Sequence, residues 1–163
     1  MIISLLDRLH RIEAALAAIS YVLVTGLLLS GIIARELFST TIWGSEKVAV
    51  FAAVFAAFLG LTLATAANSH LRPRFTDHWW PDPWQKKVAR GGDFFSAFLF
   101  FGIAVVTGIY VSDTFINEDR AAVIYWPLWP IQLVIAYSFL SSGVRHLAFA
   151  LWPKIKPQAE ILE

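Results

Sequence analysis

The chain has 163 residues, of which 58% are hydrophobic and only 15% are charged, and its formal net charge is +1. A soluble domain carries about 25% charged residues, so this composition excludes an ordinary soluble protein and favours a membrane protein. The absence of cysteine excludes disulfides, thiolate metal sites and cysteine nucleophiles.

Clusters of charged residues separate four uncharged runs, at 14–34, 48–68, 94–112 and 121–144. A helix of about 20 residues spans about 30 Å, the thickness of the hydrocarbon core of a bilayer. A buried soluble bundle is disfavoured, because each of its helices would carry a polar stripe. The sequence therefore predicts an all-α membrane protein that forms a single integral membrane domain over residues 1–163, with four transmembrane helices at approximately 14–37, 46–69, 92–116 and 126–150.

The segment before the first run has apolar residues at helical spacing, and charged residues lie between them. This N-terminal amphipathic segment could lie on the inner leaflet, or it could extend the first span into the cytoplasm. The first run is too long for a signal peptide and has no clear cleavage site, so we expect a retained anchor. The apolar positions are Ile2, Leu5, Leu6, Leu9 and Ile12.

The distribution of lysine and arginine predicts the orientation, because cations are retained on the cytoplasmic side. Ten of them lie in the N-terminal segment, the middle loop and the C-terminal tail, and three lie in the other two connections. We therefore expect a multi-pass protein of the inner membrane with both termini and the middle loop in the cytoplasm. The three cations on the opposite side are Arg35, Lys47 and Arg120.

The middle loop contains the stretch HWWPDPWQKK, residues 78–87. Tryptophan rings prefer the headgroup level of a bilayer, and lysine side chains reach from there to water and anionic lipid. Asp82 and Pro83 are typical of a helix start, and whether that helix continues past Gly91 and Gly92 into the third span is open. The candidate residues of this cytoplasmic membrane interface are His70, Trp79, Trp80, Trp84, Lys86 and Lys87.

Ionisable residues are expected at the boundaries of the predicted spans, and the four histidines at or outside span ends. Ion-coupled transporters place ionisable groups within the bilayer, so this pattern favours an accessory or scaffold subunit. A di-haem cytochrome would need histidine pairs inside the bundle, and an enzyme would need clustered acid, base or metal ligands. We therefore expect no catalytic activity and no cofactor, metal or nucleic-acid site.

The order of several short motifs resembles one family of membrane subunits. Arg35 closes the first span, Trp43 and Glu46 open the second, Gly60 lies within it and His70 follows it. With a basic middle loop and the fourth-span pattern YWPLWPIQLVIAYSFLSSGVRHL, this order resembles the small membrane subunit (Q subunit) of tripartite ATP-independent periplasmic transporters, known as TRAP transporters.

One departure concerns the residues after the histidine. Family members often have an acidic residue there, whereas this chain has HLRPR, with Arg74 at that place. Any contact that the acidic residue makes in the family is therefore not expected here.

The resemblance implies a non-catalytic scaffold in a sodium-coupled importer of an organic acid. Its partners would be a large multi-span membrane subunit, a periplasmic substrate-binding protein and the surrounding membrane lipids. The small subunit would stabilise the large subunit and help to dock the binding protein. The alternative is a self-contained small channel or exporter that acts as a homo-oligomer.

Small residues of the second span fall on one arc of the helix, opposite Phe51, Phe55 and Phe58. A smooth face allows close approach of another helix, which belongs either to a partner subunit or to the same bundle. We also expect Glu46 to pair with Arg35 or with a cation of the large subunit. The candidate subunit-interface residues are Arg35, Trp43, Glu46, Ala52, Ala56, Gly60 and Ala64.

Overall fold

Four long helices make up nearly all of the protein, which is described by a computed structural model over residues 2–68 and 82–157. The helices are α1 (Ile2–Phe38), α2 (Ser45–Ala66), α3 (Asp82–Ile116) and α4 (Trp129–Leu151), and a short 3-10 helix, η2 (Pro153–Ile155), follows α4. All four long helices are apolar and long enough to cross a membrane. Within the described residues, the extended structure consists of an isolated bridge between Arg120 and Pro127. The protein is therefore all-α with four candidate membrane spans, as predicted.

Helices α1 and α3 are longer than a bilayer requires. They contain 37 and 35 residues, which at 1.5 Å per residue gives each a length of more than about 50 Å. Helix α1 is continuous from Ile2, so the N-terminal segment and the first span belong to one helix. Helix α3 likewise continues through Gly91 and Gly92, which resolves the question left open by the sequence.

The two inner helices have the length of single spans. Helix α2 has 22 residues and begins after Gly44, whose backbone is left-handed with φ of 76°. Helix α4 has 23 residues and begins with Trp129 and Pro130, because proline is tolerated in the first turn of a helix. It ends before Pro153, which begins η2.

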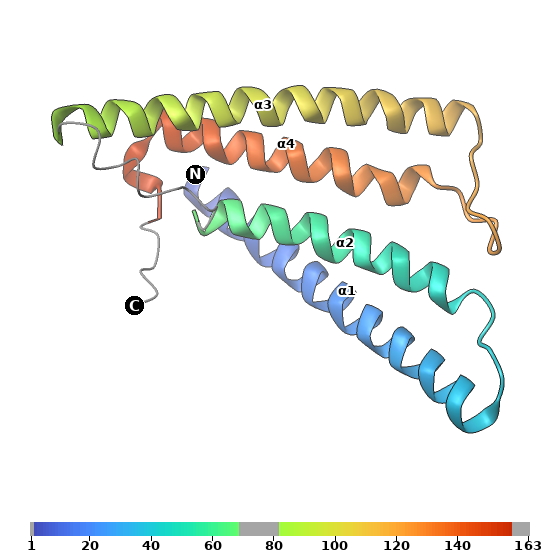
Figure 1. Cartoon of the computed structure of the whole chain (residues 1–163). Helices are drawn as coiled ribbons and strands as arrows, with labels where there is room; N and C mark the ends of the chain where they lie inside the picture. The colour runs from blue at the N-terminus through green and yellow to red at the C-terminus, as the bar shows by residue number, and fades with distance from the viewer. Residues whose placement is uncertain (1, 69–81, 158–163) are drawn as a thin grey trace.

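The helices are arranged in the spatial order α1, α2, α4, α3 (Figure 1). Helix α2 packs against both α1 and α4, and α4 packs against both α2 and α3. More than half of the most apolar stretch of α4 is buried within the protein. The most apolar stretch of α1 has no buried residue. The apolar stretch of α4 also has the lowest mean hydropathy of the four candidate spans. The most polar span therefore occupies the centre, where its polar side chains find protein partners instead of lipid.

The chain forms two helical hairpins, α1–α2 and α3–α4, which converge at one end and diverge toward the other (Figure 1). We call the end with the start of α1, residues 66–68 and residues 152–157 the terminal end. The opposite end, with connections 39–44 and 117–128, is the loop end. Phe58 of α2 meets Phe139 of α4 with ring centroids 5.9 Å apart, and other named contacts between α2 and α4 lie nearer the terminal end. The first turns of α1 also reach α4 there.

Candidate functional site

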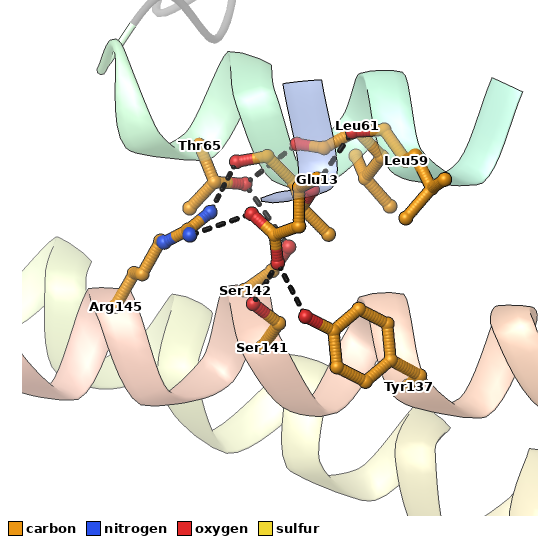
Figure 2. A network of polar contacts seen from close by, with 9 residues as sticks. Glu13, Leu59, Leu61, Thr65, Tyr137, Ser141, Ser142 and Arg145 are labelled. Carbon is orange, nitrogen blue, oxygen red and sulfur yellow. Dashed lines mark hydrogen bonds and ion pairs between the residues drawn. The ribbon is translucent and has the colours of Figure 1, made fainter. Parts of the chain in front are cut away.

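A buried ion pair joins the two hairpins at the terminal end. Nη2 of Arg145 in α4 lies 2.6 Å from Oε2 of Glu13 in α1. The side chains are 3% and 1% exposed, so both charges have been removed from solvent and lipid. Figure 2 shows the Glu13 carboxylate between the Arg145 guanidinium on one side and two hydroxyl groups of α4 on the other.

The hydroxyl groups belong to Tyr137 and Ser141, which donate to Oε1 of Glu13 over 2.7 and 2.8 Å. Tyr137, Ser141 and Arg145 are spaced by four residues, which places them on one side of α4 in successive turns. One carboxylate from α1 thus receives three hydrogen bonds from a single stripe of α4. A carboxylate buried in this way keeps its charge compensated and its lone pairs occupied.

Arg145 also connects α4 to α2. Its Nη1 donates to the main-chain carbonyl of Thr62 over 2.7 Å, and Thr62 is fully buried. Thr62 lies in the last turns of α2, where carbonyl oxygens approach the negative end of the helix dipole and a cation is favourable. We call Glu13, Thr62, Tyr137, Ser141 and Arg145 the Glu13–Arg145 network. It joins three of the four helices.

The network has clear energetic consequences. Removing two charges from water is costly, and their attraction compensates for this only when further hydrogen bonds satisfy the remaining polar atoms. The network meets this condition for the carboxylate, and its geometry is consistent with charge-assisted hydrogen bonds. An intact pair contributes orientation more than net stability, whereas loss of one partner would leave a buried charge alone.

A second buried group of charges joins α3 to the segment after α4. Asp93 of α3 lies 3.3 Å from Nδ1 of His146 and accepts from Nζ of Lys156 at both oxygens, over 2.8 and 2.7 Å. The His146 ring stacks on Phe100 of α3, with centroids 5.4 Å apart. We call Asp93, His146 and Lys156 the Asp93 cluster. It fixes the residues that follow η2 against α3 and α4.

Further polar contacts close the helix ends nearby. Nε of Arg90 in α3 donates to the carbonyl of Ala150 in the last turn of α4 over 2.6 Å. Asn68, just after α2, donates to the carbonyl of Pro157 over 3.1 Å. These contacts provide hydrogen-bond donors to carbonyl groups at and beyond the end of α4. The terminal end is therefore held together by polar groups contributed by all four helices.

The hydroxyl groups of Thr65 and Ser142 lie 3.1 Å apart where α2 crosses α4. Both residues are buried and small, which lets the two backbones approach closely. A cavity of about 230 Å³ lies beside Arg145, lined also by the start of α1, the end of α2 and the segment after η2.

The ionisable residues were expected at the span boundaries, and the structure shows that several of them are enclosed by the helices. Four ionisable side chains are buried between the helices, and each lies within a helix long and apolar enough to span the membrane: Glu13, Asp93, Arg145 and His146. The uncharged runs 14–34 and 121–144 end one residue short of Glu13 and Arg145, so charge clustering alone assigned both to the surface. His146 was likewise expected at an exposed span end and is 7% exposed.

A signal for the site was present in the sequence. The fourth span carries the polar positions Tyr137, Ser138, Ser141, Ser142 and Arg145, which form a stripe at helical spacing. Such a stripe within a membrane span indicates a buried face, since polar residues rarely face lipid. The sequence did not indicate that Glu13, at the start of the first span, would be its partner.

The predicted residues at the loop end are exposed. The side chain of Arg35 is 59% exposed, and its Nε lies 3.6 Å from Oε1 of Glu36, its neighbour in sequence. Glu46 is also exposed and lies with Arg35 along a groove of about 210 Å³ between α1 and α2. Arg35 therefore pairs with Glu36 and not with Glu46. Trp43 is 74% exposed beside this groove.

The small-residue arc of α2 is divided between two environments. Ala52 is 6% exposed and lies on the buried face of α2, whereas Ala56 and Ala64 are half-buried. A Cβ added at Gly60 would meet no atom within 4 Å, so this part of the arc faces away from the chain's own helices. On the other side of the helix, Phe58 packs on Phe139 of α4. One edge of the arc thus belongs to the protein interior and the other is available to another molecule.

The predicted interface of the middle loop is described only in part. His70, Trp79 and Trp80 lie outside the described residues, as does the side chain of Lys86. Trp84 is 54% exposed in the first turn of α3, and Nζ of Lys87 lies 5.9 Å from the centroid of its ring. A tryptophan and a lysine side by side on an exposed helix end suit the headgroup region of a bilayer.

The buried polar groups connect the helices to one another. Each buried ionisable residue whose side chain the structure describes, Glu13, Asp93, Arg145 and His146, has a partner within the chain. In the same residues, no group of three or more histidine, cysteine or acidic side chains is placed to hold a metal ion. The fold and the site together define a polytopic membrane protein whose candidate spans are fixed to one another by buried polar contacts.

A sequence model of the family described as tripartite ATP-independent periplasmic transporters, DctQ component, matches residues 24–152. The chain belongs to this family, and it is a small membrane subunit of a TRAP transporter in the inner membrane. The match includes Arg145 and begins after Glu13. No curated protein and no solved structure matches the chain.

Proposed function

We propose that this subunit is a rigid, non-catalytic scaffold for the large membrane subunit of a TRAP transporter that imports an organic acid together with sodium ions. The observation that carries this proposal is the pairing of each buried charge with groups of the same chain. A sodium or substrate site would need oxygen ligands or cations that remain available to bind. Here the carboxylate of Glu13 and the guanidinium of Arg145 are used to join helices.

The exposed apolar faces of the outer helices support a role in assembly. Helices α1 and α3 bury almost none of their apolar stretches within the chain, and α2 exposes the Gly60 edge of its small-residue arc. The large subunit would cover part of this surface, and lipid would cover the rest. The loop end, with Trp43, Glu46 and Arg120, would help to dock the binding protein.

This role requires the loop end to face the periplasm and the terminal end to face the cytoplasm. The distribution of cations supports this orientation. Because the chain has no cysteine, single cysteines can be introduced at exposed positions and tested with a membrane-impermeant maleimide. We expect labelling from outside the cell for Ser39→Cys and Asn117→Cys, and labelling of Trp84→Cys only after the membrane is made permeable. Labelling of Trp84→Cys in intact cells would contradict the orientation.

Reconstitution tests the scaffold role. Vesicles would contain this subunit alone, the large subunit alone, or both, each with and without the binding protein. We expect sodium-dependent uptake of the binding protein's ligand only when all three proteins are present, because the buried charges among the described residues are paired within this chain and do not remain available to couple to an ion. Uptake or ion conduction by this subunit alone would favour the alternative, a self-contained homo-oligomeric channel or exporter. Full activity without this subunit would also contradict the proposal.

A further inference from the structure

The connection between α3 and α4 is a tight and strained turn. Three main-chain hydrogen bonds close it, from Ala121 N to Trp126 O over 2.8 Å, from Tyr125 N to Ala121 O over 2.9 Å, and from Leu128 N to Asp119 O over 3.0 Å. Val123 and Tyr125 have φ angles of 79° and 55°. Left-handed backbone is unfavourable for side chains other than glycine, especially β-branched ones, and such conformations persist only when the surroundings fix them.

The residue between the two strained positions touches the other hairpin. A Cβ added at Gly44 would lie 2.7 Å from Cγ2 of Ile124, closer than two carbon atoms can approach. Gly44 lies in the connection between α1 and α2 and itself has φ of 76°. Glycine is thus favoured at position 44 by both its backbone conformation and its lack of a side chain. Ile124 is half-buried, whereas Val123 and Tyr125 are exposed.

This contact lies far from the other attachments between the hairpins. The ring contact of Phe58 and Phe139 lies nearer the loop end than the polar contacts between α2 and α4, and the two hairpins diverge toward the loop end (Figure 1). About 26 Å of helix separates Thr62 in the Glu13–Arg145 network from Ser45 at the start of α2. A rotation of about 10° at the network would therefore move the loop end of α2 by about 4 to 5 Å. Polar contacts at the terminal end alone do not limit such a rotation.

We propose that Ile124 and Gly44 form a clasp that fixes the distance between the two helical hairpins at the loop end. The strained turn carries Ile124 across the gap between the hairpins, and Gly44 provides the space that receives it. The Glu13–Arg145 network holds the two hairpins together at the terminal end, and the clasp holds them together at the loop end. The angle between α1–α2 and α3–α4 is therefore fixed.

Distance measurements on the isolated subunit test the clasp without any partner. Spin labels would be attached to Leu37→Cys and Ile116→Cys, which replace residues 74% and 70% exposed at the loop ends of α1 and α3. We expect a narrow distance distribution in the otherwise unchanged chain. Ile124→Ala and Gly44→Val should each broaden it and shift its mean by about 4 to 5 Å.

Two controls separate the clasp from general loosening. Labels at Arg8→Cys and Gly91→Cys, at the terminal end, should keep their distribution in both variants. Gly108→Val is the same substitution at a position where an added Cβ meets no atom within 4 Å. It should therefore leave the distance distribution at the loop end unchanged. An unchanged loop-end distribution in Ile124→Ala would overturn the proposal.

Covalent cross-linking keeps the proposal testable if Gly44→Val does not fold. With mild oxidant, the pair Gly44→Cys and Ile124→Cys should form an intramolecular disulfide, because a bridge requires Cβ atoms about 4 Å apart. The pair Gly60→Cys and Ile124→Cys should not, since Gly60 lies about 22 Å along α2 from Ser45 at the start of that helix. Failure of the first pair to cross-link, in a chain that is folded by circular dichroism, would also overturn the clasp.

Discussion

Replacing Arg145 by methionine is expected to lower the free energy of unfolding of the subunit by about 3 to 5 kcal/mol. The substitution leaves the Glu13 carboxylate buried without its cation and leaves the carbonyl of Thr62 without its donor. The measurement is denaturant or thermal unfolding in mixed micelles, followed by circular dichroism. The same loss should appear as a low yield of folded protein in the membrane.

The double variant Glu13→Met, Arg145→Met distinguishes a buried charge from lost packing. Two buried methionine side chains carry no charge that must be neutralised. The double variant should therefore recover most of the stability lost in Arg145→Met. Arg35→Met is the matched control, since Arg35 is 59% exposed and pairs with exposed Glu36; we expect a change within about 0.5 kcal/mol. Equal losses for Arg145→Met and Arg35→Met would show that the Glu13–Arg145 network does not hold the hairpins.

Two substitutions on the small-residue arc of α2 are expected to separate folding from assembly. Ala52→Leu adds a bulky side chain to a buried face and should destabilise the isolated subunit by about 1 to 3 kcal/mol. Gly60→Leu points into open space, so it should leave the stability of the isolated subunit unchanged.

If the large subunit packs on the Gly60 edge, Gly60→Leu should reduce co-purification with it by about tenfold or more. The control is Gly102→Leu on α3, where a Cβ also meets no atom within 4 Å. Normal co-purification of Gly60→Leu would show that lipid covers this edge. Loss of the fold in Gly60→Leu would contradict the geometry itself.

The helices and their order could be predicted from the sequence because these depend on local properties. Uncharged runs of sufficient length define the spans, and Pro130 marks the first turn of α4. Gly91 and Gly92 left the continuity of α3 open, since glycine weakens a helix without breaking it, and the packing of α3 on α4 decided it.

The candidate site depended on the tertiary structure. Glu13 and Arg145 are 132 residues apart, and each adjoins an uncharged run, so hydropathy placed both at the membrane surface. The residue pattern of one helix does not identify the residue in another helix that will neutralise a buried charge. That choice follows from the crossing of α1 over α2 and α4, which brings the carboxylate to the polar stripe of α4. The sequence by itself determined four membrane-spanning helices and the family, and the packing of those helices decided which of their charges became part of the interior.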